Sequence, residues 1–310
     1  LTGTPMENNL VELWSIFDFL MPQYLFNYHY FQKQYESSIV KNNDEEKTKQ
    51  LKKLVTPFIL RRNKKEVLKE LPDKIEQNMI LPFSDEEEKI YVANLAKVNE
   101  ELQQLYDIEG SDKMQILKML TRLRQLCLEP RLVYDNIDQP SSKLKACMEL
   151  IKTMQENKQK VLLFSSFTSA LGLIAEECQK TGITYYMLTG STNKEERREL
   201  VSRFQKDDTT LFLISLKAGG TGLNLTSAEN VIHYDPWWNV SAQNQATDRA
   251  YRIGQKSNVQ VFNLVMKDSV EEKIIEMQKR KKELADMFVE NNSGGLSQMS
   301  KEDILSLFTM

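Results

Sequence analysis

Arg249 and Arg252 are the side chains of this sequence best suited to chemistry. If residues 241–253 form a helix, then Gln245, Asp248 and the two arginines stand at i, i+3, i+4 and i+7 and share one face. A planar guanidinium pairs with phosphate oxygens and stabilises charge on a γ-phosphate, so this stripe is typical of a phosphoryl-transfer site. The same spacing also fits an ordinary surface helix with an internal Asp–Arg pair.

Small, polar and glycine-rich residues follow four of the predicted strands. Ligands of open α/β sheets bind beyond the carboxyl ends of the strands, where exposed backbone N–H groups approach a phosphate closely. The residues in these four loops are Ser165 and Ser166; Thr189 and Gly190; Ser215, Lys217, Gly219, Gly220, Thr221 and Gly222; and Asp235, Pro236, Trp237 and Trp238.

An α/β fold is needed to position these loops. Short β-rich runs alternate with amphipathic helices, which predicts a parallel sheet with helices on both faces. Thr192 with Glu195 predicts a capping box for one of these helices, and Ser84 with Glu87 predicts another upstream, in preference to a metal-binding acidic motif. The predicted strands are 161–164, 184–188, 211–214, 231–234 and 259–265, and the helices are 168–180, 193–205, 241–253 and about 269–290.

The region before the sheet is predicted to be mostly helical. Apolar residues recur at helical spacing from Asn8 to Glu70, and residues 84–128 carry two helical stretches around a turn at 109–111. The predicted divisions are 1–83, the end of a first lobe and a helical protrusion; 84–140, a protrusion or linker; 141–267, the α/β lobe; 268–290, a bracing helix; and 291–310, a flexible tail.

The composition excludes several classes of protein. Three widely spaced cysteines indicate neither a disulfide framework nor a zinc site, and two histidines leave little for a metal centre, so we predict no metal site within the chain. No apolar run or leader indicates a membrane protein. The net charge of −3 limits nucleic-acid contact to local patches, such as residues 61–65 or 279–282, which equally read as solvated helix faces.

The sequence resembles the SWI/SNF-type helicase-like ATPases, and its compact protrusions favour a bacterial member. The resemblance extends over about residues 1–290 and rests on several motifs in order. They are Leu1–Pro5 with Asn8; Phe58–Arg62 with Leu71 and Pro72; Ser142–Leu144; Phe164–Ser166; Lys217–Leu225; and Asp248–Gln255. Val240, Gln243 and Tyr251 depart from the usual Pro, Glu and His.

The resemblance implies a RecA-like, two-lobe motor that hydrolyses ATP with Mg²⁺ between its lobes and tracks along double-stranded DNA without separating the strands. This chain would be the second lobe, and Trp237 and Trp238 would serve packing before base contact. The implied roles are arginine fingers for Arg249 and Arg252; nucleotide binding for Gly220, Gly222, Gln245 and Asp248; and DNA-backbone contact for Ser165, Thr189, Gly190, Ser215, Lys217 and Asn224.

A phosphate-binding loop of the form G-x-x-x-x-G-K-[S/T] is absent from the sequence. We therefore expect that the chain is a fragment, that a first lobe preceding Leu1 holds ATP and Mg²⁺, and that the fragment alone is inactive. Without that lobe, the apolar face of Leu10, Trp14 and Phe17 is expected to be exposed.

Two other functions stay open. One is the second lobe of a helicase that acts on RNA or single strands, and the other is a non-catalytic interaction module. The expected location is the cytoplasm, at the nucleoid, for a bacterial protein and the nucleus for a eukaryotic one. The protein target of any remodelling is not encoded in recognisable motifs, and no sequence-specific DNA reader is visible.

Overall fold

The computed structural model divides the chain into two compact units. It describes residues 10–42, 44–59, 71–106, 113–219 and 223–288. Unit 1 comprises Leu1–Lys69, Trp238–Ser241 and Glu276–Ser300, and unit 2 comprises Glu70–Trp237, Ala242–Ile275 and Lys301–Met310. Several predicted features lie outside the described residues, namely Leu1–Pro5, the basic patch at 61–65, the turn at 109–111, Gly220, Gly222 and the tail at 291–310.

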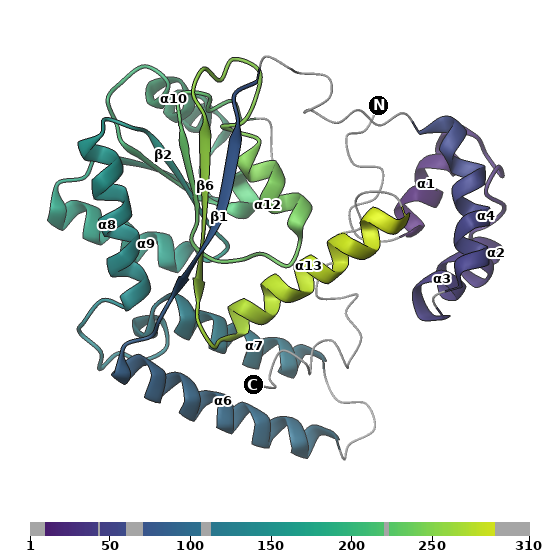
Figure 1. Cartoon of the computed structure of the whole chain (residues 1–310), viewed down its shortest axis with the longest axis horizontal. Coiled ribbons are helices and arrows are strands. Elements are labelled where there is room, and N and C mark those ends of the chain that lie inside the picture. The colour runs from purple at the N-terminus through teal and green to yellow at the C-terminus, as the bar shows by residue number, and fades with distance from the viewer. Residues whose placement is uncertain (1–9, 43, 60–70, 107–112, 220–222, 289–310) are drawn as a thin grey trace. The chain divides into compact units, whose positions relative to one another are not determined.

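A six-stranded parallel sheet forms the centre of unit 2, with the strand order β1-β6-β5-β2-β4-β3 (Figure 1). This confirms the predicted α/β class. The strands are β1 (Lys74–Leu81), β2 (Val161–Ser165), β3 (Tyr185–Leu188), β4 (Leu211–Ser215), β5 (Asn230–His233) and β6 (Val259–Met266).

Helices cover both faces of this sheet, because consecutive residues of its inner strands pack into two different apolar clusters. Val161 and Leu163 of β2 join one cluster, whereas Leu162 and Phe164 join the other, and all four are almost fully buried. Both faces of the sheet are therefore shielded from water, as the near-continuous apolar strands require. The first cluster includes side chains of α8 (Ser142–Glu156) and α9 (Thr168–Thr181); the second includes α10 (Lys194–Phe204), α11 (Leu216–Gly219) and α12 (Val240–Thr247).

The edge strand β1 was not predicted from the sequence. It pairs with β6 over its full length, from Lys74 opposite Val259 to Leu81 opposite Met266. Its middle residues are polar, and Ile75 and Ile80 stay about half exposed, so β1 has neither the apolar run nor the regular alternation of a buried strand. Its partner lies far away in the sequence, which no local pattern reveals.

Two predicted helix starts have different outcomes. The capping box at Ser84 is confirmed: its N–H donates to Glu87 Oε2 at 2.8 Å and its Oγ accepts from the Glu87 N–H at 3.4 Å, before α6 (Asp85–Tyr106). The capping box that the sequence predicts at Thr192 does not form, so this prediction is wrong. Asn193 caps α10 instead, because its Oδ1 accepts from two N–H groups of the first turn, while Thr192 Oγ1 accepts from the Thr189 N–H.

The remaining helices of unit 2 flank the sheet. The two helical stretches predicted over 84–128 are present as α6 and α7 (Lys113–Leu128), and Figure 1 shows α7 beside the end of the sheet at which β6 terminates. The predicted bracing helix is α13 (Val270–Phe288), which begins in unit 2 and continues into unit 1. Nowhere in the described residues is a helix both long and apolar enough to cross a membrane.

Unit 1 is a small helical bundle. Its helices are α1 (Leu10–Leu20), α2 (Tyr28–Phe31), a π-helical turn (Gln32–Glu36), α3 (Ser37–Asn42), α4 (Glu45–Val55) and a 3₁₀ turn (Thr56–Phe58). The expected exposure of Leu10, Trp14 and Phe17 is wrong. Leu10 and Phe17 are buried and Trp14 is partly buried, because Phe31 and Leu51 close over that face of α1. Among the described residues of α1, the large apolar side chains that stay exposed are Phe19, at 85%, and Leu20, at 66%.

Candidate functional site

The segment that carries the two arginines is not a continuous helix. Helix α12 ends at Thr247, and the chain then tightens into a turn, in which the N–H groups of Arg249 and Ala250 donate to the carbonyls three residues earlier. The predicted helix over 241–253 is thus too long. Gln245 lies on α12, whereas Asp248, Arg249 and Arg252 lie beyond it, so the four do not share one helical face.

The two arginines influence each other electrostatically. Arg249 is partly buried and Arg252 is exposed. Burial lowers the pKa of Arg249, the positive charge of Arg252 lowers it further, and Asp248 acts in the opposite direction. Both guanidinium groups stay charged near neutral pH, so the segment keeps two mutually repelling cations close together.

Hydrogen bonds fix this segment against the loop that follows Gly222. The Leu225 N–H donates to the carbonyl of Arg249 at 3.0 Å, and Gln255 Nε2 donates to the carbonyls of Ala228 and Ala250. Ala228 lies two residues before β5 begins. The arginine segment therefore lies against residues 225–228 and toward the amino-terminal ends of β5 and β6, whereas Gly220 and Gly222 lie outside the described residues.

The predicted DNA-contacting residues lie mostly at the opposite, carboxyl-terminal edge of the sheet. Ser165 and Ser215 are register partners at the ends of β2 and β4, and both are buried. Lys217 and Gly190 are exposed and Thr189 is partly buried. Asn224 is also exposed but lies elsewhere, on the loop whose backbone accepts from Gln205 Nε2. The structure thus separates the arginine segment from the residues at this edge. They are called the strand-end group below and are Ser165, Thr189, Gly190, Ser215 and Lys217.

Asp235 is the centre of a buried polar cluster at that edge, and sequence reasoning gave it no role of its own. Its Oδ1 accepts from Ser165 Oγ at 2.7 Å and from the Ser166 N–H at 3.0 Å, and its Oδ2 accepts from Ser166 Oγ. Ser165 Oγ in turn accepts from the Phe167 N–H at 3.1 Å. The hydroxyl of Ser165 is therefore engaged inside the protein and shapes the loop after β2.

Arg124 completes the cluster from helix α7, and the sequence analysis missed it. Its Nη2 lies 2.9 Å from Asp235 Oδ2, and its guanidinium carbon lies 4.9 Å and 5.5 Å from the ring centres of Phe167 and Trp237. A usable signal was present in the sequence: an arginine among buried leucines, including Leu123, needs a buried partner.

A chain of amide hydrogen bonds links the loop after β5 to the edge strand. The Trp237 N–H donates to Gln243 Oε1 at 3.3 Å, Gln243 Nε2 donates to Asn263 Oδ1 at 2.9 Å, and Asn263 Nδ2 donates to Asn78 Oδ1 at 2.9 Å and to Glu76. The amide at Gln243 both donates and accepts. A glutamate at position 243 would have no proton to donate to Asn263. This is a physical reason for Gln243 in place of the usual Glu.

His233 makes the stability of this site sensitive to pH. The side chain is fully enclosed, stacks on Phe164 and shares a 2.9 Å hydrogen bond with Thr247 Oγ1. Burial lowers its pKa to about 4, with Lys74 acting in the same direction and nearby carboxylates in the other. The unfolded histidine binds a proton near pH 6.5, at which the folded one stays neutral.

We therefore expect the free energy of unfolding to fall by up to about 3 kcal/mol as the pH decreases from about 6.5 to about 4. Denaturant unfolding between these values measures the slope, and His233→Gln should flatten it. His29, the other histidine, is exposed, so His29→Gln is the matched control and should leave the slope unchanged. Equal slopes for the parent and His233→Gln would contradict this assignment.

Metal ligands do not gather anywhere in the described ranges: no group of three or more His, Cys, Asp or Glu side chains there is placed to hold an ion.

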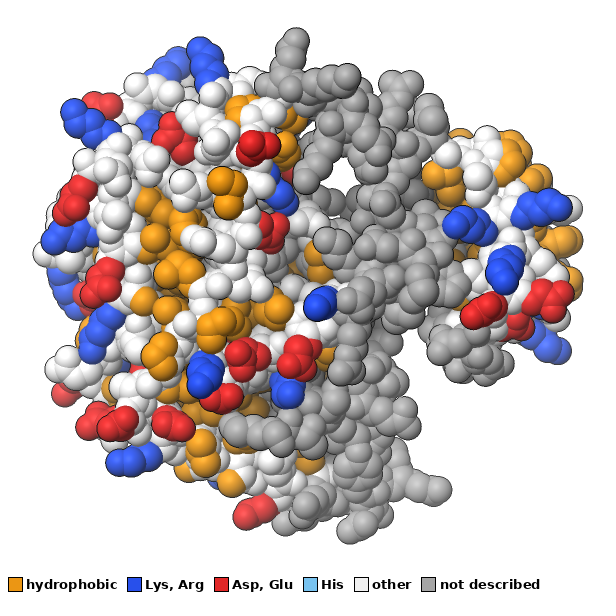
Figure 2. Space-filling model, in the orientation of Figure 1, with side chains coloured by type: hydrophobic (Ala, Val, Ile, Leu, Met, Phe, Trp, Pro, Cys, Tyr) orange, Lys and Arg blue, Asp and Glu red, His pale blue; other side chains and the backbone are white. Residues whose placement is uncertain are grey.

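The charged side chains on the surface of unit 2 are of mixed sign. On the face of unit 2 seen in Figure 2, basic and acidic side chains alternate without a broad patch of one sign. Any contact with nucleic acid on this face is therefore local.

Comparisons with known proteins agree with the geometry. Residues 1–132 match the SNF2-related domain, and residues 142–254 match the helicase conserved C-terminal domain. The chain is 37% identical to an uncharacterized ATP-dependent helicase of Mycoplasma pneumoniae and 33% identical to the ISWI chromatin-remodeling complex ATPase ISW1 of Saccharomyces cerevisiae. In both cases 99% of this chain aligns, and it spans 29% of the relative's length.

A solved structure has the same fold. The SWI2/SNF2 ATPase core of Sulfolobus solfataricus in complex with double-stranded DNA is 33% identical, with a TM-score of 0.62. The alignment covers 99% of this chain and 65% of that one. The parallel sheet described above is thus shared with a RecA-like ATPase core.

Proposed function

The chain belongs to the SNF2-type family of ATP-dependent helicase-like ATPases, and from this premise we propose that it is the second motor lobe of a double-stranded DNA translocase. In the complete protein, a first lobe outside this chain holds ATP and Mg²⁺. The second lobe, formed by this chain, supplies arginines to the γ-phosphate and holds the DNA backbone. Repeated closure of the two lobes on ATP then moves the protein along the duplex.

The observation that carries the catalytic part is the position of Arg249 and Arg252 in one short segment after α12, in which the carbonyl of Arg249 accepts from the Leu225 N–H. Two planar guanidinium groups carry the charge and the paired N–H donors that bind phosphate oxygens. We assign both as arginine fingers that stabilise the charge developing on the γ-phosphate. Gln245 and Asp248, with Gly220 and Gly222 of the glycine-rich loop, complete the nucleotide contacts in this proposal.

The described donor groups fit the phosphates of ATP but not its metal ion, since no carboxylate cluster among them is placed to hold one. We therefore place the Mg²⁺ ligands in the first lobe. Mg²⁺ held there would supply positive charge to the phosphate oxygens. The part of this chain is to hold positive charge on the opposite side of the nucleotide.

The strand-end group supports the DNA contacts. Exposed Lys217 offers a cation to the phosphate backbone, and exposed Gly190 allows close approach of its N–H group. Ser165 and Ser215 are buried, so we assign them to shaping the loops whose backbone faces DNA, together with Thr189. Asn224 contributes from the separate loop. Because ISW1 is named a chromatin-remodeling complex ATPase, remodelling of chromatin or of another nucleoprotein is the proposed output.

The proposal predicts which polymer stimulates the full-length protein. ATP turnover is expected to rise at least about tenfold with duplex DNA and to rise far less with single-stranded DNA or duplex RNA of equal length, because the backbone geometry differs. Stimulation mainly by RNA or single strands would favour the helicase alternative. Turnover that no nucleic acid changes would favour the interaction-module alternative.

The isolated 310-residue chain is expected to show no ATP turnover above background, because it contains no phosphate-binding loop motif. A coupled assay for phosphate release, run with and without duplex DNA, measures this. Arg252→Ala is the control for contamination. Turnover by the chain that disappears in this variant would contradict the need for a first lobe.

A further inference from the structure

We propose that Arg124 is a positioning residue that couples helix α7 to the DNA-facing loops of the sheet. The inference rests on the proposed function, because it assigns a role in DNA binding to a residue outside the α/β lobe. It concerns two short segments: residues 165–167, which begin at the last residue of β2, and residues 235–237 after β5. They are called the paired loops below.

The guanidinium of Arg124 contacts both paired loops at once. Its Nη2 donates to Ser166 Oγ at 3.0 Å in the first loop, and to Asp235 Oδ2 at 2.9 Å and the Pro236 carbonyl at 3.3 Å in the second. Its guanidinium carbon also lies 4.9 Å and 5.5 Å from the centres of one ring from each loop, those of Phe167 and Trp237. The side chain therefore fixes the distance and the angle between the paired loops.

Burial makes this contact strong and specific. The side chains of Arg124 and Asp235 are only 7% and 1% exposed, so water neither screens nor replaces their interaction. Asp235 also accepts from Ser165 and Ser166, which ties the carboxylate to the loop after β2. Lysine cannot reproduce the contact. Its compact ammonium lacks the planar fork with which a guanidinium reaches several acceptors and packs against aromatic rings.

The position of Arg124 indicates a role beyond stability. Helix α7 lies outside the sheet, yet its Arg124 reaches the edge at which Ser215 ends the neighbouring strand β4 and Lys217 follows on α11. A shift of α7 therefore moves the paired loops relative to Lys217. We infer that Arg124 sets the DNA affinity of the motor, and that it transmits movements of helices α6 and α7 to the paired loops that face DNA.

The test uses the full-length protein and four readouts: the DNA concentration for half-maximal ATPase (KM for DNA), the maximal rate, the salt dependence of DNA binding and the melting temperature. Arg124→Lys keeps the charge that Asp235 needs, so the variant should fold. We expect its KM for a 40-base-pair duplex to rise about tenfold, with a maximal rate within about twofold of the parent. The salt slope should fall by about one unit, equivalent to one lost phosphate contact.

A matched control is available on the same helix. Arg122 bonds Asn94 and Tyr134 and makes no contact with the paired loops, so Arg122→Gln should leave KM for DNA unchanged. If Arg124→Lys fails to fold, the double variant Arg124→Gln with Asp235→Asn leaves no buried unpaired charge and should show the same rise in KM.

The outcomes separate the two proposals. A folded Arg124 variant with the parent's KM and salt slope would overturn this inference, as would an equal rise in KM for Arg122→Gln. A parent enzyme that duplex DNA does not stimulate would overturn the proposed function, and this inference with it. Stimulation of the parent with a selective rise in KM for the Arg124 variants would support both.

Discussion

Replacing Arg252 by alanine is expected to lower the ATP turnover of the full-length protein about 10³-fold at saturating duplex DNA, because an arginine finger typically contributes ~10³ to 10⁵ in rate. The side chain is exposed, so its removal leaves no buried group without a partner and should not affect folding. Single-turnover and steady-state hydrolysis, measured with saturating ATP, give the size of the loss.

The control for this variant is Lys256→Ala, which removes an exposed cation four positions further along the same segment. The proposed site does not include Lys256, so turnover should stay within about twofold of the parent. DNA affinity should be unchanged in both variants. A loss below about tenfold for Arg252→Ala, or an equal loss for Lys256→Ala, would contradict the finger assignment.

Replacing Lys143 by methionine is expected to lower the free energy of unfolding by about 3 to 5 kcal/mol, the usual cost of breaking a buried ion pair. Lys143 Nζ lies 2.7 Å from both carboxylate oxygens of Glu271, and the two side chains are 0% and 1% exposed. Glu271 also accepts from the Met266 N–H at 2.9 Å. The pair fastens the start of α13 to α8 and to the end of β6, and the single replacement leaves a carboxylate buried without its cation.

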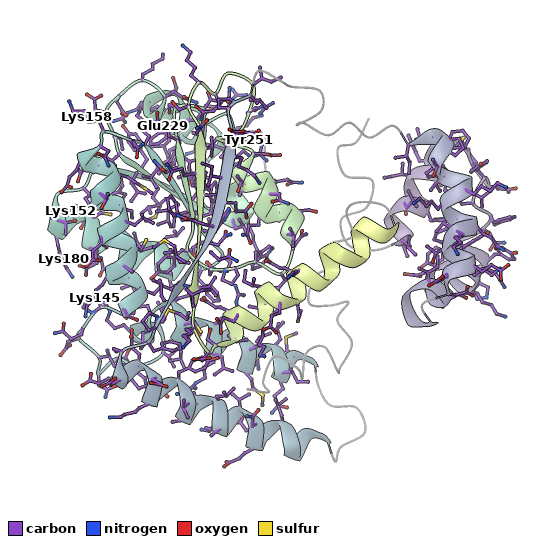
Figure 3. The ribbon with its side chains drawn as sticks, viewed as in Figure 1. Lys145, Lys152, Lys158, Lys180, Glu229 and Tyr251 are labelled. Atoms are coloured by element: carbon purple, nitrogen blue, oxygen red, sulfur yellow. The ribbon has the colours of Figure 1, made fainter. Side chains whose placement is uncertain are left out.

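Denaturant unfolding measures this loss. Lys145→Met is the matched control, because Lys145 lies on α8 and points outward (Figure 3), and it should change stability by less than about 0.5 kcal/mol. The double variant with Met at 143 and Leu at 271 should recover most of the loss, since an apolar pair often replaces a buried ion pair without cost. A double variant as unstable as Lys143→Met would contradict the explanation by an unpaired charge.

The inner sheet could be predicted from the sequence, because the strands between the two helical layers are rich in apolar and β-branched residues. The five predicted strands all exist, whereas edge strand β1 was missed, since its polar residues follow no period and its pairing with β6 is non-local. The end of α12 was misplaced for a related reason. Residues 248–253 have helical spacing, but their backbone bonds to the loop at Leu225 instead of continuing the helix.

The candidate site was predicted in part. The arginines and the strand-end loops were found because their residue types carry a chemical meaning at a fixed spacing. The ion pair of Arg124 with Asp235 was not, because it joins residues 111 positions apart. The buried state of Ser165 also depends on that pairing. Contacts of this kind follow from the fold, which no single stretch of sequence encodes.

The most direct test of the central claim is displacement of a third strand from a DNA triplex by the full-length protein. A motor that tracks along duplex DNA should release the third strand only with ATP, leave the duplex paired, and fail to do so when Arg252 is alanine. Separation of the duplex strands, or ATP hydrolysis without release of the third strand, would contradict the account of this chain as the second lobe of a double-stranded DNA translocase.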